Sequence, residues 1–270
     1  MSPGKPNAAA MSAACDVVEN LPYTTDGGYG QRALIGLIAL ARDYTVEQEM
    51  GRVLAGLDDV AHYITRIDSP VEVRPETLAA MGPNIAAAAQ LLLNPDDVDV
   101  VAYGCTSASA VLGPDAVSKA IRSVHPQAKV TNPLSATCEA VKALGIQRLG
   151  VLTPYASSVN QFIYESLSAA GIHIEVFGTF NIEHDPTVAK LDAKSVRSGI
   201  HHIVKGRAVD GIFVSCTNVR LVEEINDLEQ TLNLPVLSSN SALIWHALRL
   251  GGVNDVMPQL GTLARHQQRR

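Results

Sequence analysis

The chain has 270 residues, of which 47% are hydrophobic and 18% are charged, so it can bury a sizeable core and is not a disordered chain. Its length suits two lobes of roughly 100–150 residues each better than one core. The formal net charge is −6 and no run of Lys or Arg occurs before Arg269, which argues against nucleic acid and anionic membranes as partners. No apolar stretch approaches the ~20 residues that cross a bilayer.

The N-terminal residues and the cysteines indicate the cellular compartment expected for the protein. Residues 1–30 lack the apolar run of a signal peptide and are expected to form a flexible extension. The cysteines show no CxxC spacing and no histidine at metal-ligand spacing; they are Cys15, Cys105, Cys138 and Cys216. Without a secretion signal, free thiols in the cytoplasm are the default. We therefore expect no metal site.

From Gln31 onward, strand-like and helix-like stretches alternate. The first half predicts strands over residues 33–41, 60–67, 98–103 and 129–131, and helices over 45–57, 75–93, 116–124 and 135–144. The second half predicts strands over residues 148–152, 172–177, 209–214 and 235–237, and helices over 157–170, 194–204, 220–232 and 242–250. Such alternation predicts an α/β fold built from parallel sheets with right-handed crossovers.

The two halves contain an internal repeat. Three matches occur in the same order: Gly36-Leu37-Ile38 with Gly150-Val151-Leu152, residues 98–101 with 209–212, and Ser135-Ala136 with Ser241-Ala242. Two lobes related by a pseudo-two-fold axis would bring equivalent residues face to face across a cleft, and parallel sheets bind ligands beyond the carboxyl ends of their strands. Cys105 and Cys216 both follow such strand ends. We expect one lobe from residues 31–135 and 240–270 and the other from residues 136–239.

The repeated cysteines point to chemistry rather than to packing alone. Each is expected to open a turn into a helix, whose backbone N–H groups favour a thiolate. The following turn residues can hold a carboxylate or a developing enolate oxygen; they are Thr106, Ser107, Thr217 and Asn218. A thiolate on one face of a carbon can remove a proton or add to it, while a thiol on the other face returns a proton. Burial as a small hydrophobic residue fits Cys138 better.

Three segments carry a family resemblance. Residues 103–107 (YGCTS), 150–155 (GVLTPY) and 214–218 (VSCTN) resemble the aspartate/glutamate racemase superfamily. The nearest branch holds maleate cis–trans isomerases, arylmalonate decarboxylases and ectoine-utilisation racemase-like proteins. The resemblance implies that Cys105 is a nucleophile, that Cys216 gives or takes a proton, and that Tyr155 binds a substrate carboxylate. It also implies carboxylate contacts from the turn residues named above, a small carboxylate substrate and no cofactor.

The sequence also departs from the maleate isomerase pattern. Those enzymes carry a substrate-binding Asn after the first strand, where this chain has Leu40-Ala41-Arg42-Asp43. A second such Asn is replaced by His184 or Asp185. Carboxylates near the cleft would repel a dicarboxylate but suit an amino or amidinium group. This favours a nitrogen-bearing substrate, such as an amino acid or an ectoine derivative, over maleate, and it makes Asp185 a candidate binding residue.

Two alternatives to an isomerase remain open. One is decarboxylation through an enediolate with Cys216 as the proton source. In the family that this chain resembles, the arylmalonate decarboxylases lack the first-lobe cysteine, whereas this chain keeps it, which argues against this alternative. The other is a two-lobed protein that binds a small acid without turnover, against which the duplicated thiol argues. The frequency of dimers among such α/β enzymes leads us to expect a homo-oligomer.

Overall fold

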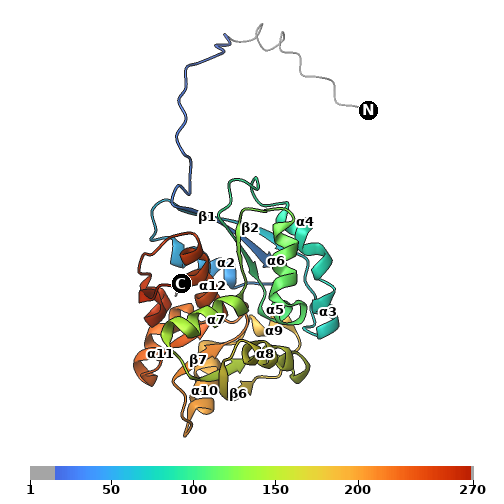
Figure 1. The fold of residues 1–270 in the computed structure, drawn as a ribbon, viewed down its shortest axis with the longest axis vertical. Helices are drawn as coiled ribbons and strands as arrows, with labels where there is room; N and C mark the ends of the chain where they lie inside the picture. Colours follow the sequence, from blue (N-terminus) through green and yellow to red (C-terminus); the bar gives the residue numbers. More distant parts are fainter. Residues whose placement is uncertain (1–15, 269–270) are drawn as a thin grey trace.

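The computed structural model describes residues 16–268 and contains two four-stranded parallel sheets flanked by helices (Figure 1). The strand order is β2-β1-β3-β4 in the first sheet and β6-β5-β7-β8 in the second. The same order therefore recurs four strands later, as the internal repeat predicts. The expected α/β class with two similar sheets is confirmed.

The strands place the ends of β3 and β7 at equivalent positions. The first sheet contains β1 (Ala33–Leu40), β2 (Val60–Ile67), β3 (Val100–Gly104) and β4 (Lys129–Thr131); the second contains β5 (Arg148–Thr153), β6 (His173–Thr179), β7 (Gly211–Val214) and β8 (Val236–Ser238). Every residue of β1, β3 and β7 is buried, as expected for parallel strands covered on both faces. Figure 1 shows β1 and β2 in one half of the molecule and β6 and β7 in the other.

The helices connect these strands. They are α2 (Val46–Leu54), α3 (Pro75–Ala79), α4 (Ile85–Ala89), α5 (Thr106–Leu112), α6 (Pro114–Arg122), α7 (Pro133–Leu144), α8 (Ser157–Ala169), α9 (Asp185–Val188), α10 (Ala193–Val204), α11 (Ile225–Leu232) and α12 (Ser239–Leu250), with 3-10 helices η1 (Gly82–Asn84), η2 (Val222–Glu224) and η3 (Pro258–Arg265). Although it follows the second sheet, α12 packs on α7, α2 and strands of the first sheet. The lobe boundaries at residues 135 and 240 stay a prediction.

Among residues 16–268, none of the helices combines the length and the apolar character needed to cross a membrane. Residues 16–30 contain no helix or strand. Cys15 and the rest of residues 1–15 lie outside the described residues.

Three predicted helices differ from the structure. The one over residues 75–93 is divided into α3, η1 and α4 around Gly82-Pro83, because proline cannot continue a regular helix. The one over residues 116–124 is preceded by an unpredicted helix, α5, and Gly113 separates the two with φ +83°. The one over residues 220–232 begins only at η2. Cys105 therefore caps a helix, whereas Cys216 lies in an irregular turn.

Candidate active site

Cys105 is held at the point where β3 ends and α5 begins. Cys105 is 2% exposed and occupies the N-cap position of α5. The thiol accepts the backbone N–H of Ala108 at 3.3 Å and lies 3.6 Å from Oγ of Ser107. The start of α5 thus fixes both the position of the sulfur and the direction in which it faces.

Cys216 has a backbone conformation that residues other than glycine rarely adopt. Its φ is +110°, outside the regions open to residues with a Cβ. The surrounding contacts hold it there: its N–H donates to Oγ of Ser239 at 2.9 Å, and its thiol accepts the N–H of Asn218 at 3.4 Å. Oγ1 of Thr217 also donates to the Gly104 carbonyl, at 3.3 Å. This last bond ties the Cys216 turn to the strand that carries Cys105.

Both thiols line one cavity of about 20 Å³. The residues predicted for substrate binding that share its wall are Ser107, Tyr155, Asp185, Thr217 and Asn218. Thr106 is the predicted site residue that is not among them, because its hydroxyl donates to Oγ of Ser239 at 2.8 Å. Since Ser239 also accepts the N–H of Cys216, Thr106 links the two cysteine turns.

Burial controls the protonation of both thiols. It raises the pKa of Cys105 to about 12, against a smaller lowering by the Ala108 N–H and the Ser107 hydroxyl. Burial also raises the pKa of Cys216 well above its usual range, and the charge of Asp185 adds to this. The N–H donors expected to favour a thiolate are therefore present, but loss of water outweighs them. Both thiols are neutral in this closed state.

Tyr155 lies between the two cysteine turns. Its side chain is 2% exposed, and its hydroxyl is close enough to interact with the Cys216 thiol and the Ser107 hydroxyl. Its backbone carbonyl accepts Nδ2 of Asn160 at 2.7 Å. Tyr155, which follows β5 of the second sheet, thus contributes its hydroxyl to the cavity that both cysteines line.

Of the two alternatives at residues 184 and 185, the carboxylate is the one at the cavity. Asp185 begins α9 and is 5% exposed, and its Oδ2 accepts Nδ2 of Asn218 at 3.2 Å. His184 is exposed and contacts Oγ1 of Thr187 at 2.8 Å. Asp43, which was not predicted as a site residue, lines the same cavity. Its place just beyond the carboxyl end of β1 is the signal that could have identified it.

Segments from both halves of the chain close the cavity. The N–H of Val73 donates to the Glu183 carbonyl at 2.8 Å, and the N–H of Asp185 donates to the Val71 carbonyl at 2.9 Å. Arg74 and Glu183 form an ion pair at 2.9 Å. The enclosed volume holds about one water molecule. A carboxylic acid is larger than this volume, so the cavity must widen to admit one.

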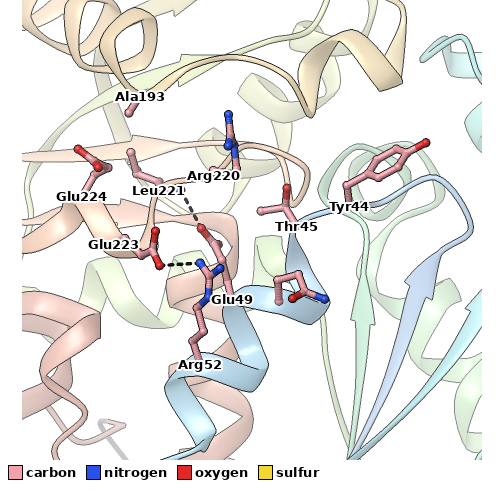
Figure 2. Close-up of a pocket in the computed structure, with 10 residues that line it drawn as sticks. Tyr44, Thr45, Glu49, Arg52, Ala193, Arg220, Leu221, Glu223 and Glu224 are labelled. Carbon is pink, nitrogen blue, oxygen red and sulfur yellow. Dashed lines mark hydrogen bonds and ion pairs between the residues drawn. The ribbon is translucent and has the colours of Figure 1, made fainter.

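A larger hollow of about 440 Å³ lies next to the site but contains neither cysteine (Figure 2). Thr45 lines it and donates from Oγ1 to the Asn218 carbonyl at 3.0 Å. Figure 2 shows Glu49 reaching the backbone of Leu221 beside this hollow. Both predicted cysteines line the smaller cavity, so we place the candidate site there. Within residues 16–268, no three or more His, Cys, Asp or Glu side chains are grouped to hold a metal ion.

Asp185 predicts a pH dependence of stability. Burial raises its pKa from 3.8 to about 6, so the folded protein keeps this proton where the unfolded chain has released it. The resulting stabilisation is present below about pH 4 and is lost as the pH rises to about 6, by at most about 3 kcal/mol. We expect the free energy of unfolding of Asp185→Asn to rise relative to that of wild type between about pH 4 and 6. Above about pH 6 the difference between the two proteins should stay constant. Urea unfolding between pH 4 and 7 measures the difference, and parallel curves for the two proteins would contradict it.

Comparisons with known proteins agree with this arrangement. Residues 63–264 match the family model described as arylmalonate decarboxylase. A maleate isomerase of Nocardia farcinica is 26% identical over 243 residues, which cover 86% of this chain and 95% of that protein. An arylmalonate decarboxylase of Bordetella bronchiseptica is 28% identical over 135 residues, 49% of this chain and 56% of that protein. The crystal structure of a maleate isomerase from Pseudomonas putida S16 with maleate has a similar fold, with a TM-score of 0.80, 22% identity, and 86% and 97% of the two chains covered. The chain therefore belongs to the arylmalonate decarboxylase and maleate isomerase family of the aspartate/glutamate racemase superfamily.

Proposed function

We propose that the protein is a cofactor-independent isomerase or racemase that acts on a carbon next to a carboxylate, with Cys105 and Cys216 as the reactive groups. The observation that carries the proposal is that two buried thiols, each beyond the third strand of its sheet, line the same small cavity. The similarity to a maleate isomerase over 86% of the chain supports it.

For a cis–trans isomerisation, Cys105 is the nucleophile. When the cavity opens to admit the substrate, the Cys105 thiol releases its proton to water. The resulting thiolate adds to one alkene carbon, and Cys216 gives its proton to the neighbouring carbon, so that the double bond becomes a single bond. After rotation about that bond, Cys216 takes a proton back and the carbon–sulfur bond breaks. The product leaves with both cysteines in their starting state.

For a racemisation, the two cysteines exchange a proton through the substrate. One removes the α-proton, and the charge develops on the adjacent carboxylate oxygens as an enediolate. The other then delivers a proton to the opposite face. The hydroxyl and amide donors around the cavity would hold these oxygens; they are Ser107, Tyr155, Thr217 and Asn218. Thr106 would contribute by joining the two cysteine turns.

Decarboxylation is the second candidate. The match to the arylmalonate decarboxylase model over residues 63–264 favours it. In that reaction the substrate loses CO₂, the electron pair passes to an enediolate, and Cys216 protonates the carbon. One thiol suffices, so Cys105 would be dispensable. Retention of both thiols at the cavity supports isomerisation instead.

Further parts of the proposal concern substrate and setting. Asp185 at the cavity wall supports a nitrogen-bearing acid, such as an amino acid or an ectoine derivative, as the substrate. The described cysteines are free thiols, and chemistry that needs free thiols suits a reducing compartment such as the cytoplasm. A homo-oligomer, with a dimer as the simplest form, remains the expected assembly.

Deuterium incorporation from D₂O tests the function. A panel of maleate, amino acids of both configurations, ectoine-derived acids and an arylmalonate is incubated with the protein and followed by NMR. We expect deuterium at the α-carbon of one acid, together with its inversion or isomerisation. Loss of CO₂ from the arylmalonate would favour the decarboxylase, and ligand binding without exchange or CO₂ release would favour a binding protein.

A further inference from the structure

Two carboxylates lie in the wall of the cavity that holds both thiols. Asp43 follows β1 and Asp185 begins α9, and they are 3% and 5% exposed. Burial raises the pKa of both carboxyls, and the charge of Asp43 raises the pKa of Asp185 further. Buried carboxylates are normally matched by a cation or by a full set of hydrogen bonds. The hydrogen bonds and ion pairs of Asp43 and Asp185 therefore show which kind of group is missing from the cavity.

Asp43 has one satisfied oxygen and one unsatisfied oxygen. Its Oδ1 accepts the N–H groups of Thr45 at 2.7 Å and Val46 at 2.9 Å. Its Oδ2 is buried and has no hydrogen-bond partner. The Thr217 hydroxyl lies close enough to Asp43 to lower the pKa of its carboxyl, but the hydrogen bond that it makes in the structure goes to the Gly104 carbonyl at 3.3 Å. Asp43 thus brings an unpartnered carboxylate oxygen to the cavity.

The nearest cations are engaged elsewhere. Arg42 pairs with Asp68, and Arg66 pairs with Glu47. Neither Asp43 nor Asp185 takes part in an ion pair with any residue between 16 and 268. The charge of Arg66 lowers the pKa of Asp43 and that of Arg42 lowers the pKa of Asp185, but burial has the larger, opposite effect on each. The two carboxylates therefore have distant positive charges but no directly paired cation.

We propose that Asp43 and Asp185 form a subsite for a protonated nitrogen, an ammonium or amidinium group, that the substrate carries beside its carboxylate. This inference rests on the proposed function and specifies its substrate class. A cation between the two oxygens would relieve their repulsion and satisfy Oδ2 of Asp43 through charge-assisted hydrogen bonds. A dianion such as maleate would instead add two negative charges to a buried, already acidic site. The substrate is then a zwitterionic acid.

A rival explanation is that one or both carboxyls are protonated and donate hydrogen bonds to a second substrate carboxylate. Replacement by Asn separates the two explanations. Asn keeps a hydrogen-bond donor of similar shape but cannot carry the negative charge. If the carboxyls act as neutral donors, the Asp43→Asn and Asp185→Asn variants still recognise the substrate. If they act as carboxylates, both variants lose it.

Three thiol reagents that differ in charge test the subsite. They are the cationic 2-aminoethyl, the neutral methyl and the anionic 2-sulfonatoethyl methanethiosulfonates, reacted with the full-length protein at pH 7.5. Peptide mass analysis locates the labels on Cys105 and Cys216. Relative to 2-mercaptoethanol as a free thiol, we expect the cation-to-neutral rate ratio to be at least about ten-fold higher at these sites.

The variants should remove this preference. We expect Asp43→Asn and Asp185→Asn each to lower the cation-to-neutral ratio by roughly five- to ten-fold. Asp115→Asn, which removes an exposed carboxylate at the start of α6, should leave the ratio unchanged. A wild-type ratio equal to that of 2-mercaptoethanol would overturn the proposal, and this result does not depend on whether any variant folds. A high wild-type ratio that both Asn variants retain would overturn the assignment to these residues.

The labelling result and the function can fail separately. Labelling needs no turnover, so a strong cation preference without deuterium exchange on any acid would leave the subsite in place and reject the isomerase. Exchange on a dianion such as maleate, with no cation preference, would keep the isomerase and reject the subsite.

Discussion

Removal of either site thiol is expected to lower kcat/KM for isomerisation or racemisation by at least about 10³-fold, or about 4 kcal/mol. Cys105 and Cys216 line the same cavity and are proposed to act on opposite faces of one carbon, so neither can replace the other. Because they act as a unit, the Cys105→Ala, Cys216→Ala variant should be hardly slower than either single variant. NMR of the substrate found in the D₂O panel measures all three rates.

The matched control is Cys138→Ala. Cys138 lies on α7, is partly buried and packs against the core, away from the cavity, so its removal should leave turnover within about two-fold of wild type. Full activity of Cys105→Ala would contradict the two-thiol mechanism. Release of CO₂ from an arylmalonate by that same variant would then identify Cys216 as the only proton donor required.

The strands could be predicted closely because their patterns are local. The strand expected over residues 60–67 has those bounds in the structure, and the short strand at residues 129–131 does as well. The cysteines could be found because parallel sheets bring their carboxyl strand ends to one edge. The repeat then paired Cys105 with Cys216. The composition of each segment and one topological rule were sufficient for this part of the site.

The rest depends on contacts between distant residues. Helix α5 is rich in small polar residues that favour caps and turns over helix interiors, yet residues 106–110 are buried in it. Its start is held by the cap at Cys105, which no periodicity reveals. The neutral state of the thiols follows from burial, and burial at the cavity is a property of the packed lobes. Sequence patterns predict which groups face a cleft but not how much water reaches them.

Glu49 shows how such contacts support the site. It lies on α2 and is 4% exposed. Its Oε1 accepts the N–H group of Leu221 at 2.8 Å (Figure 2). It also accepts the N–H group of Val222 at 3.0 Å, and both residues follow the Cys216 turn. Its Oε2 accepts Nδ2 of Asn240 on α12 at 2.7 Å. Asn240 in turn donates to the Thr217 carbonyl at 2.8 Å. One carboxylate therefore joins α2, α12 and the turn that holds Cys216 in its strained conformation.

Glu49→Ala is expected to lower the free energy of unfolding by about 3–5 kcal/mol, because it leaves three buried N–H donors without an acceptor. Glu49→Gln should lose less, about 1–3 kcal/mol, since its amide oxygen still accepts the backbone donors while its NH₂ group meets that of Asn240. Urea unfolding measures both losses, and kcat measured where each variant is folded should fall as the Cys216 turn loosens.

The control is Glu47→Ala on the same helix. Glu47 pairs with Arg66 at a partly exposed position, where an ion pair contributes under about 1 kcal/mol. A loss for Glu49→Ala no larger than this would show that the turn after Cys216 is held by its own contacts. A large loss of kcat in Glu49→Gln with most of the stability kept would show the reverse: the carboxylate positions the turn, and the φ of +110° at Cys216 persists because α2 and α12 hold the residues that follow it.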